Sequence, residues 1–202
     1  MKLEDIADLF GGLTGKSKSD FTNGNARFVT YMNVYSNIAV NTNINTFVKI
    51  RENEKQTKLE YGDILFTGSS ETSDECGMSS VFAIKTDESI YLNSFCFGLR
   101  FHNKTLFDPN FCKYLFRSKK IREEIGKSAS GVTRFNISKK LFGKIKIPIP
   151  PLSIQQEIAK TLDKFDALVN DLSAGLPAEI SSRHQQYEYY RNKLLNFSEI
   201  SE

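Results

Sequence analysis

The spacing of hydrophobic positions changes near residue 147 and divides the chain into two parts. Before it, short apolar runs alternate with loops rich in Asn and Ser, such as residues 41–45 and 67–73. Short runs of β-branched and aromatic residues between such loops are typical of strands. The runs that predict strands are residues 27–32, 46–50, 64–67, 80–84 and 95–101.

Two segments of the first part have helical spacing instead. The first has Leu3, Ile6, Ala7, Leu9 and Phe10 on one side and ends at Gly11 and Gly12, which predicts a short helix there. The second predicts a helix over residues 109–127, with Lys and Arg opposite an apolar face of Phe111, Leu115, Phe116 and Ile125. Strands with flanking helices predict an α+β domain with an open, twisted β-sheet over residues 1–147.

The second part, residues 148–202, begins with three prolines, Pro148, Pro150 and Pro151, which predict a stiff extended connector. Ser153 is the expected N-cap of a following helix, with Gln156 completing a capping box. Apolar residues then recur every three or four positions, as Ile154, Ile158, Leu162, Phe165, Val169, Leu172, Leu176, Ile180, Tyr187, Leu194 and Phe197. Gly175 and Pro177 are expected to kink or break this helix.

A single apolar stripe over about 45 residues would be about 65 Å long at 1.5 Å per residue. A domain of this size cannot bury such a stripe alone, so it predicts a coiled-coil-type helical spacer that pairs with another long helix. We interpret the stripe as a dimerisation surface. The alternative is a pair of helices that folds back on its own domain.

Composition narrows the class of protein. With 202 residues, of which 40% are hydrophobic and 25% charged, the chain is typical of a packed globular protein. We expect no membrane span, because no apolar run approaches about 18 residues. Glu4 and Asp5 lie where a signal peptide would be apolar. Three scattered cysteines favour reduced thiols, and two histidines offer little for a metal site, so a cytoplasmic, metal-free protein is expected.

Charge is unevenly distributed. The net charge is +3, but residues 100–146 hold thirteen Lys or Arg against Asp108, Glu123 and Glu124, a local charge of +10. Such segregation favours a polyanion as partner, because Lys and Arg contacts to phosphate supply much of nucleic-acid affinity. The alternative is a basic surface helix that binds nothing.

Each candidate catalytic motif in the sequence lacks residues that its chemistry requires. Residues 11–17 resemble a phosphate-binding loop, but Phe10 occupies the position of its first glycine. No Lys follows an acid by two positions, as in restriction nucleases, and Pro150-Pro151 lacks the polar and aromatic neighbours of an adenine methylase loop. Neither Cys76 nor Cys112 has a histidine at a spacing that would indicate a Cys–His catalytic pair. We expect neither catalysis nor a cofactor in this chain.

Several motifs of the second part resemble the helical spacer of the DNA-specificity subunit of type I restriction–modification enzymes. They are residues 147–152 (IPIPPL), 156–158 (QEI), 162–166 (LDKFD), 175–180 (GLPAEI) and 186–195 (QYEYYRNKLL). Two upstream motifs are similar to landmarks of its target-recognition domain: a first landmark at residues 61–67 (YGDILFT) and a second landmark at residues 131–137 (GVTRFNI).

The resemblance implies DNA recognition without catalysis. Such subunits have two recognition domains joined by two paired spacers, and each domain reads half of a split DNA site. Methyltransferase subunits, which bind S-adenosylmethionine, dock on this scaffold, and a translocating restriction subunit joins them for cleavage. This sequence has one recognition domain and one spacer, which implies a half-subunit that forms a homodimer or a fragment of a longer chain.

Loop residues that can hydrogen-bond bases or phosphates are the candidate DNA contacts. They are Lys16, Lys18, Tyr31, Asn33, Ser69, Ser70, Glu71, Thr72, Lys119, Lys120, Thr133, Arg134 and Asn136. Arg134 stands out because it belongs to the second landmark, whereas Gly62 and Asp63 are expected to form a structural turn. Two alternatives remain: a coiled-coil interaction protein without sequence-specific DNA binding, and an enzyme with an undetected site.

Overall fold

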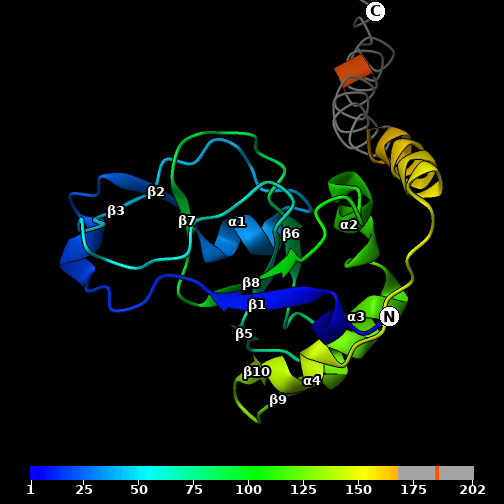
Figure 1. Ribbon diagram of the computed structural model, residues 1–202, viewed down its shortest axis with the longest axis horizontal. Helices are drawn as coiled ribbons and strands as arrows, with labels where there is room; N and C mark the ends of the chain where they lie inside the picture. Colours follow the sequence, from blue (N-terminus) through cyan, green and yellow to red (C-terminus); the bar gives the residue numbers. More distant parts are fainter. Residues whose placement is uncertain (168–184, 187–202) are drawn as a thin grey trace, which may run out of the picture. The chain divides into compact units, whose positions relative to one another are not determined.

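Three small sheets, rather than the single open sheet expected, form the mixed α/β framework of the protein in a computed structural model that describes residues 1–167 and 185–186 (Figure 1). The central sheet is antiparallel, in the order β1-β8-β4-β6. Its strands are β1 (Ala7–Gly11), β4 (Ile64–Thr67), β6 (Ser79–Val81) and β8 (Cys96–Phe101).

Two three-stranded sheets flank the central sheet. One contains β3 (Phe47–Val48), β2 (Ala26–Val29) and β7 (Ile90–Leu92), with β2 and β7 parallel. The other contains β5 (Ser69–Ser70), β10 (Phe135–Ile137) and β9 (Ala129–Ser130), all antiparallel. This last sheet connects the loop after β4 with the hairpin near residue 131.

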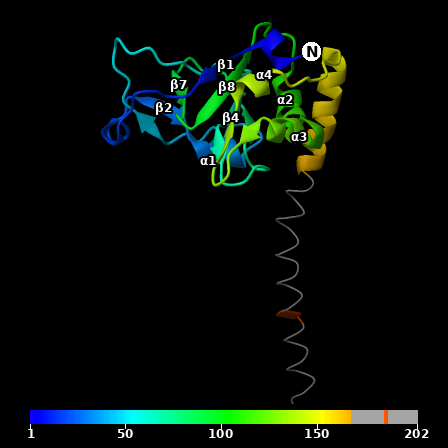
Figure 2. The same cartoon turned by 90° about the horizontal axis from the view of Figure 1, so that it is seen from below.

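Helices cover both faces of the central sheet. On one face lie α2 (Pro109–Leu115), α3 (Lys119–Lys127) and α4 (Lys139–Gly143), as Figure 2 shows. On the other face lies α1 (Tyr31–Ser36), together with β7. Side chains alternate along β4, so Ile64 and Phe66 join the first core and Leu65 the second. Two short 3-10 helices, η1 (Leu3–Asp5) and η2 (Lys18–Phe21), complete the elements with defined bounds.

The prediction of a helix at the N-terminus is wrong, because residues 7–11 form strand β1. This strand pairs with β8 over its whole length, from Ala7 opposite Phe101 to Gly11 opposite Phe97. Pairing with a strand far along the chain overrides the local spacing, which is weak over so short a segment. Gly98 makes the pairing possible, because a Cβ there would lie 2.1 Å from the ring of Phe10.

Other boundaries also differ from the sequence expectation, and the strands expected at residues 46–50 and 80–84 are the shorter β3 and β6. The strand expected at residues 27–32 ends at Val29, because Thr30 caps α1 by accepting a hydrogen bond from the Asn33 amide at 3.1 Å. The helix expected at 109–127 is two helices, broken at residues 116–118. Phe116 is fully buried at this break, and Arg117 turns toward α1.

The chain from Met1 to Ala159 forms one compact unit, which includes the first turns of a helix described over residues 152–167. The helix begins at residue 152, one position before the expected cap Ser153. The domain boundary placed at residue 147 stays a prediction. Of the expected dimerisation residues, Val169, Leu172, Leu176, Ile180, Tyr187 and Leu194 lie outside the described residues, as do Gly175, Pro177 and Phe197.

Gln155 attaches the start of this helix to the rest of the unit. Its side chain is fully buried and accepts a hydrogen bond from the Asp108 amide at 2.9 Å. It donates to the carbonyl oxygens of Leu106 at 3.1 Å and Pro150 at 2.8 Å. A buried amide with three partners fixes the first turn of the helix within the unit, since each unmade bond would be costly.

Replacing Gln155 with leucine should therefore destabilise the protein by about 2 kcal/mol, because partly buried backbone groups at Leu106 and Asp108 would be left without their partners. Urea unfolding followed by circular dichroism measures this. The matched control is Gln156→Leu, at the adjacent exposed position. A loss no larger than that of the control would contradict the role given to Gln155.

Candidate nucleic-acid interface

Six of the candidate DNA contacts line a single hollow of about 430 Å³, here called the recognition hollow. They come from three places in the fold: α1, strand β5 with the loop after it, and the loop between β9 and β10. The six are Tyr31, Ser69, Ser70, Glu71, Thr133 and Arg134. The structure thus brings together residues that are as far apart in sequence as 31 and 134.

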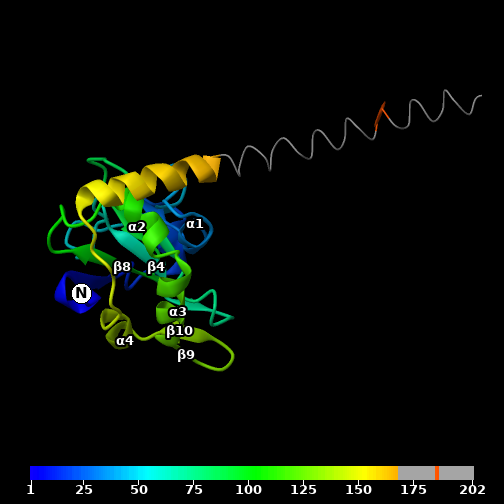
Figure 3. The same cartoon turned by 90° about the vertical axis from the view of Figure 1, so that its right-hand side faces the viewer.

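The β5-β10-β9 sheet is what joins the second landmark to the segment that follows the first. Strand β10 pairs with β5 through Phe135 opposite Ser70, and with β9 through Asn136 opposite Ser130. Gly131 closes the β9–β10 hairpin with a positive φ of 146°. A Cβ at Gly131 would lie 2.0 Å from the carbonyl oxygen of Arg134, so only glycine fits this turn. Figure 3 shows the hairpin beside α3 and α4.

Ser69 holds two of the hollow's larger side chains. The Tyr31 hydroxyl donates to its carbonyl oxygen at 2.8 Å, and the Nε of Arg134 donates to its Oγ at 3.2 Å. The Arg134 guanidinium also lies 5.8 Å from the ring centroid of Phe95. Ser69 itself is buried and does not offer its side chain to a ligand, whereas Arg134 is exposed.

Three further residues line the hollow that sequence reasoning missed: Met32, Tyr35 and Glu75. Tyr35 stacks on Tyr31 at 6.2 Å between ring centroids, one helical turn away. Its hydroxyl donates to Glu75 at 2.7 Å, which raises the pKa of Tyr35 and lowers the pKa of Glu75. The i, i+4 spacing of the two tyrosines is a signal for this helix face, but the strand predicted over residues 27–32 includes Tyr31 and so separates the pair.

Other candidates lie outside the hollow. Asn33 accepts a hydrogen bond from the Asn41 amide at 2.9 Å and so holds a loop, and the Thr72 hydroxyl donates to Glu75 at 3.0 Å. Asn136 is exposed on β10. Lys18 is exposed in η2, which packs against β3. These candidates stay predictions.

Lys119 and Lys120 begin α3, and both side chains are exposed. Lys119 lines a second hollow together with Ser73 and Asp74. The loop that follows β5 therefore borders both the recognition hollow, through Glu71, and the hollow at the start of α3. This loop therefore links the recognition hollow to the hollow that Lys119 lines.

Lys16, one of the candidate DNA contacts, does not point toward solvent. Its side chain is only 3% exposed, and its Nζ lies 2.5 Å from Glu54 and 2.5 Å from the Lys49 carbonyl oxygen. The hydrogen bonds from Lys16, Gln56 and the Arg51 amide lower the pKa of Glu54 to about 2. A lysine with these partners pins the loop that contains Glu54 and is not available to phosphate.

Acid stability should depend on this pair. Because the folded-state pKa of Glu54 is about 2 against an ordinary 4.5, its stabilising effect is present above pH 4.5 and is lost as the pH falls toward 2. Glu54→Gln should therefore flatten the stability profile within this window, measured as the thermal unfolding midpoint at each pH. The control is Glu52→Gln, an exposed neighbour. Equal slopes in the variant and the wild type would contradict the assignment.

Several of the basic side chains between residues 100 and 146 bind carbonyl oxygens or carboxylates of the protein itself. Arg117 donates to the carbonyl oxygens of Val34, Tyr35, Asn37 and Ser79, and Arg122 to those of Asp74, Cys76 and Gly77. Burial lowers the pKa of both arginines. Arg100, Lys104 and Lys127 form ion pairs with acids. The local charge of +10 thus overstates what is available to a polyanion.

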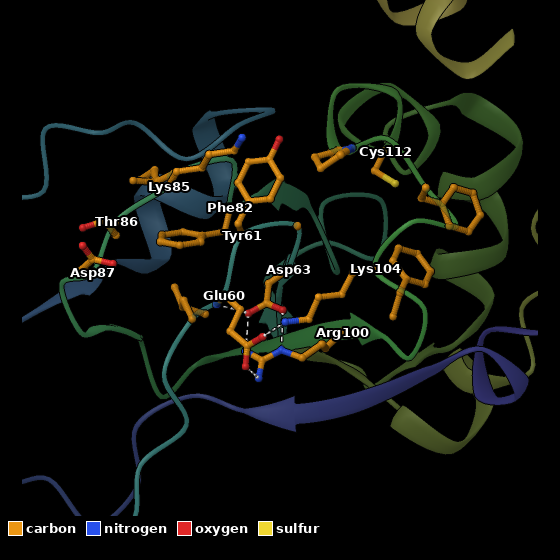
Figure 4. Close-up of a pocket in the computed structure, with 16 residues that line it drawn as sticks. Glu60, Tyr61, Asp63, Phe82, Lys85, Thr86, Asp87, Arg100, Lys104 and Cys112 are labelled. Atoms are coloured by element: carbon orange, nitrogen blue, oxygen red, sulfur yellow. Dashed lines mark hydrogen bonds and ion pairs between the residues drawn. The ribbon is translucent and has the colours of Figure 1, made fainter. Parts of the chain in front are cut away.

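Asp63 of the first landmark is structural, as expected. It is 1% exposed and accepts hydrogen bonds from Arg100 Nε at 2.8 Å and Nη2 at 2.7 Å (Figure 4). Burial raises the pKa of Asp63 although Arg100 opposes the shift, and the same contacts raise the pKa of Arg100. Gly62 adopts a φ of 93° before it, which confirms the turn. The cavity of about 490 Å³ around this pair contains none of the candidate DNA contacts.

Candidate catalytic chemistry is sparse in the part of the chain that the structure describes. Burial raises the pKa of Cys96 to about 12 and also raises the pKa of Cys76 and Cys112, which disfavours the reactive thiolate. Within residues 1–167 and 185–186, no group of three or more His, Cys, Asp or Glu could hold a metal ion. No helix among these residues has the length and apolar character needed to cross a membrane.

The family model for the type I restriction modification DNA specificity domain matches residues 1–182. The chain belongs to this family. A specificity subunit of a type I restriction enzyme from Escherichia coli is 55% identical over 60 residues, which cover 30% of this chain and 15% of that protein. A putative type I specificity subunit from Mycoplasma pneumoniae is 27% identical over 197 residues, 96% of this chain and 46% of the relative.

Solved structures of type I specificity subunits share the fold of this chain. A type I restriction–modification S subunit from M. genitalium aligns with a TM-score of 0.57 at 18% identity, covering 98% of this chain and 46% of that one. An HsdS subunit from Thermoanaerobacter tengcongensis aligns with a TM-score of 0.60 at 18% identity, covering 87% and 38%. The chain spans less than half the length of these relatives and structures.

Proposed function

We propose that this chain recognises a DNA sequence within a type I restriction–modification complex and performs no catalysis itself. The recognition hollow carries the proposal, because it gathers polar and aromatic side chains from three separate segments around an exposed arginine. Loops that present such side chains on a rigid sheet can reach base edges, while lysines nearby contact phosphate. Membership of the specificity family supports this function.

Methylation and cleavage would come from partner subunits. A DNA methyltransferase subunit, which holds S-adenosylmethionine, would use this chain as its scaffold, and a restriction and translocase subunit would join for cleavage. The S-subunit fold supports this assembly. Cellular DNA as the target places the work of such a complex in the cytoplasm.

Self-association would complete a two-part recognition surface. The helix that begins at residue 152 presents Ile154, 43% exposed, Ile158, 37% exposed, and Phe165, 61% exposed, while Leu162 is half-buried. A second copy of the chain would cover these apolar side chains as a homodimer. Two identical chains related by a two-fold axis would read inverted copies of one sequence, so the target would be a palindrome split by a fixed gap.

Salt-dependent binding to DNA tests the proposal. For the chain with its methyltransferase subunit, replacing Lys119 and Lys120 with glutamine should weaken binding to cognate and unrelated DNA alike, since phosphate contacts hold no sequence information. The slope of log affinity against log salt should fall by about two, one for each lysine that no longer neutralises a phosphate. Fluorescence anisotropy over a salt series measures both effects.

The control for this experiment is Lys55→Gln with Lys58→Gln, two exposed lysines that do not line the recognition hollow. The control should keep the wild-type slope. The proposed function fails if the wild-type complex does not bind DNA, or if the chain without other subunits methylates or cleaves it.

A further inference from the structure

Glu71 is an unusual residue for a surface that faces DNA. Its carboxylate is exposed in the recognition hollow and has no hydrogen-bond or ion-pair partner among the described residues. The other acid of the hollow differs, because Glu75 is held by Tyr35 at 2.7 Å and by Thr72 at 3.0 Å. An unpaired carboxylate repels phosphate, so a DNA ligand that fits it must present a hydrogen-bond donor.

Base edges offer such donors in the major groove. The exocyclic amino groups N4 of cytosine and N6 of adenine point into this groove, and Glu or Asp accepts from N4 of cytosine. Glu71 directly follows β5, whose Ser69 and Ser70 pair with β10, so its backbone is anchored to the same sheet as the second landmark. The position favours a fixed contact with a base rather than a contact with solvent alone.

Arg134 supplies the complementary group on the same hollow. Its Nε is used by Ser69, and its guanidinium lies near the Phe95 ring, but its two terminal amino groups have no hydrogen-bond partner among the described residues. Those groups form the fork that matches O6 and N7 of guanine. Because Ser69 and Phe95 already restrict the side chain, less conformational freedom is lost on binding.

We infer that Arg134 and Glu71 recognise the two bases of one G·C pair from the major groove, guanine through Arg134 and cytosine through Glu71. The inference rests on the proposed function and deepens it by assigning a base pair to two named residues. A G·C pair presents two acceptors on guanine beside one donor on cytosine. The recognition hollow offers the complementary groups, a fork of donors on Arg134 and an acceptor on Glu71.

Selection of preferred sites from a randomised DNA library tests this assignment. The complex of the full chain with its methyltransferase subunit is prepared in three forms: wild type, Glu71→Ala and Arg134→Lys. Each variant should lose about 10- to 100-fold of its preference for G·C at one position, the same position in both variants, and keep its other preferences. The control is Glu123→Ala, at an exposed acid on α3 outside the recognition hollow.

A second measurement changes the DNA instead of the protein, and its wild-type arm does not depend on how the variants fold. Replacing the guanine of the assigned pair by 7-deazaguanine removes one acceptor of Arg134, so it should weaken wild-type binding about tenfold and Arg134→Lys binding much less. The inference is overturned if the two variants relax different positions or none while the wild type remains selective. A wild-type complex that selects no sequence would instead overturn the proposed function itself.

Discussion

A chain with Ile154→Glu and Ile158→Glu is expected to be monomeric and to lose its affinity for a two-part DNA site. The two side chains lie one helical turn apart on the exposed side of the helix. In the proposed homodimer each would be buried, which stabilises association by roughly 1.5–3 kcal/mol per side chain. Glutamate there would place unpaired charges in the interface, at a cost well above that stabilisation.

In this double variant, the affinity for DNA with two half-sites should fall much more than the affinity for DNA with one. Linking two binding modules raises affinity by about 10²–10⁴, so the double variant should lose about a hundredfold or more on a split palindrome. Its affinity for a single half-site should not change, because the recognition hollow is left intact. Light scattering gives the oligomeric state, and anisotropy with the two DNAs gives the affinities.

The matched control for the double variant is Gln156→Glu, a charge introduced at an exposed polar position of the same helix. It should remain dimeric. A wild-type chain that is monomeric at about 50 μM, alone and with its methyltransferase subunit, would mean that the proposed homodimer and the palindrome are both wrong, since the pairing surface would be too weak to matter.

Phe66→Ala should have the largest effect on stability, a loss of about 3–5 kcal/mol. Phe66 is fully buried in the central sheet and packs on three other rings, with centroids 5.2 Å away for Phe97, 5.4 Å for Phe116 and 4.9 Å for Phe142. These rings belong to β8, to the end of α2 and to α4, so a cavity at residue 66 would loosen three elements together. Urea unfolding gives the size of the loss.

Two further variants check that this loss comes from packing. Phe66→Leu should retain much of the stability, since it refills part of the cavity. Phe47→Ala, at a ring that is 43% exposed, should cost far less. Similar losses for Phe66→Ala and Phe47→Ala would contradict the central place given to this cluster.

Strand predictions succeeded where the residues alone determine the structure and failed where a distant partner decides it. Residues 64–67 are apolar on both faces and lie between two cores, so their composition indicates a buried strand. Residues 7–11 have helical spacing, yet β8 imposes a strand on them. No local pattern contains that pairing, because the partner lies about 90 residues away.

The same distinction applies to the candidate site. Residue type and the second landmark pointed to Arg134 and Thr133, and the recognition hollow contains both. Charge alone misplaced Lys16, because its partner Glu54 lies 38 positions further along the chain. Tyr35 and Glu75 were missed since their contact joins α1 to the loop after β5. Buried arginines such as Arg117 cannot be told from surface ones by counting charge.

The bonds made by Gln155 have a consequence for how such proteins diversify. All three of its partners are backbone atoms, at Leu106, Asp108 and Pro150. Every amino acid except proline offers both kinds of atom, so this joint makes no demand on the side chains around it. Recombination could therefore exchange one set of the proposed DNA-reading loops for another and leave this joint intact, because the joint depends on no side chain except that of Gln155.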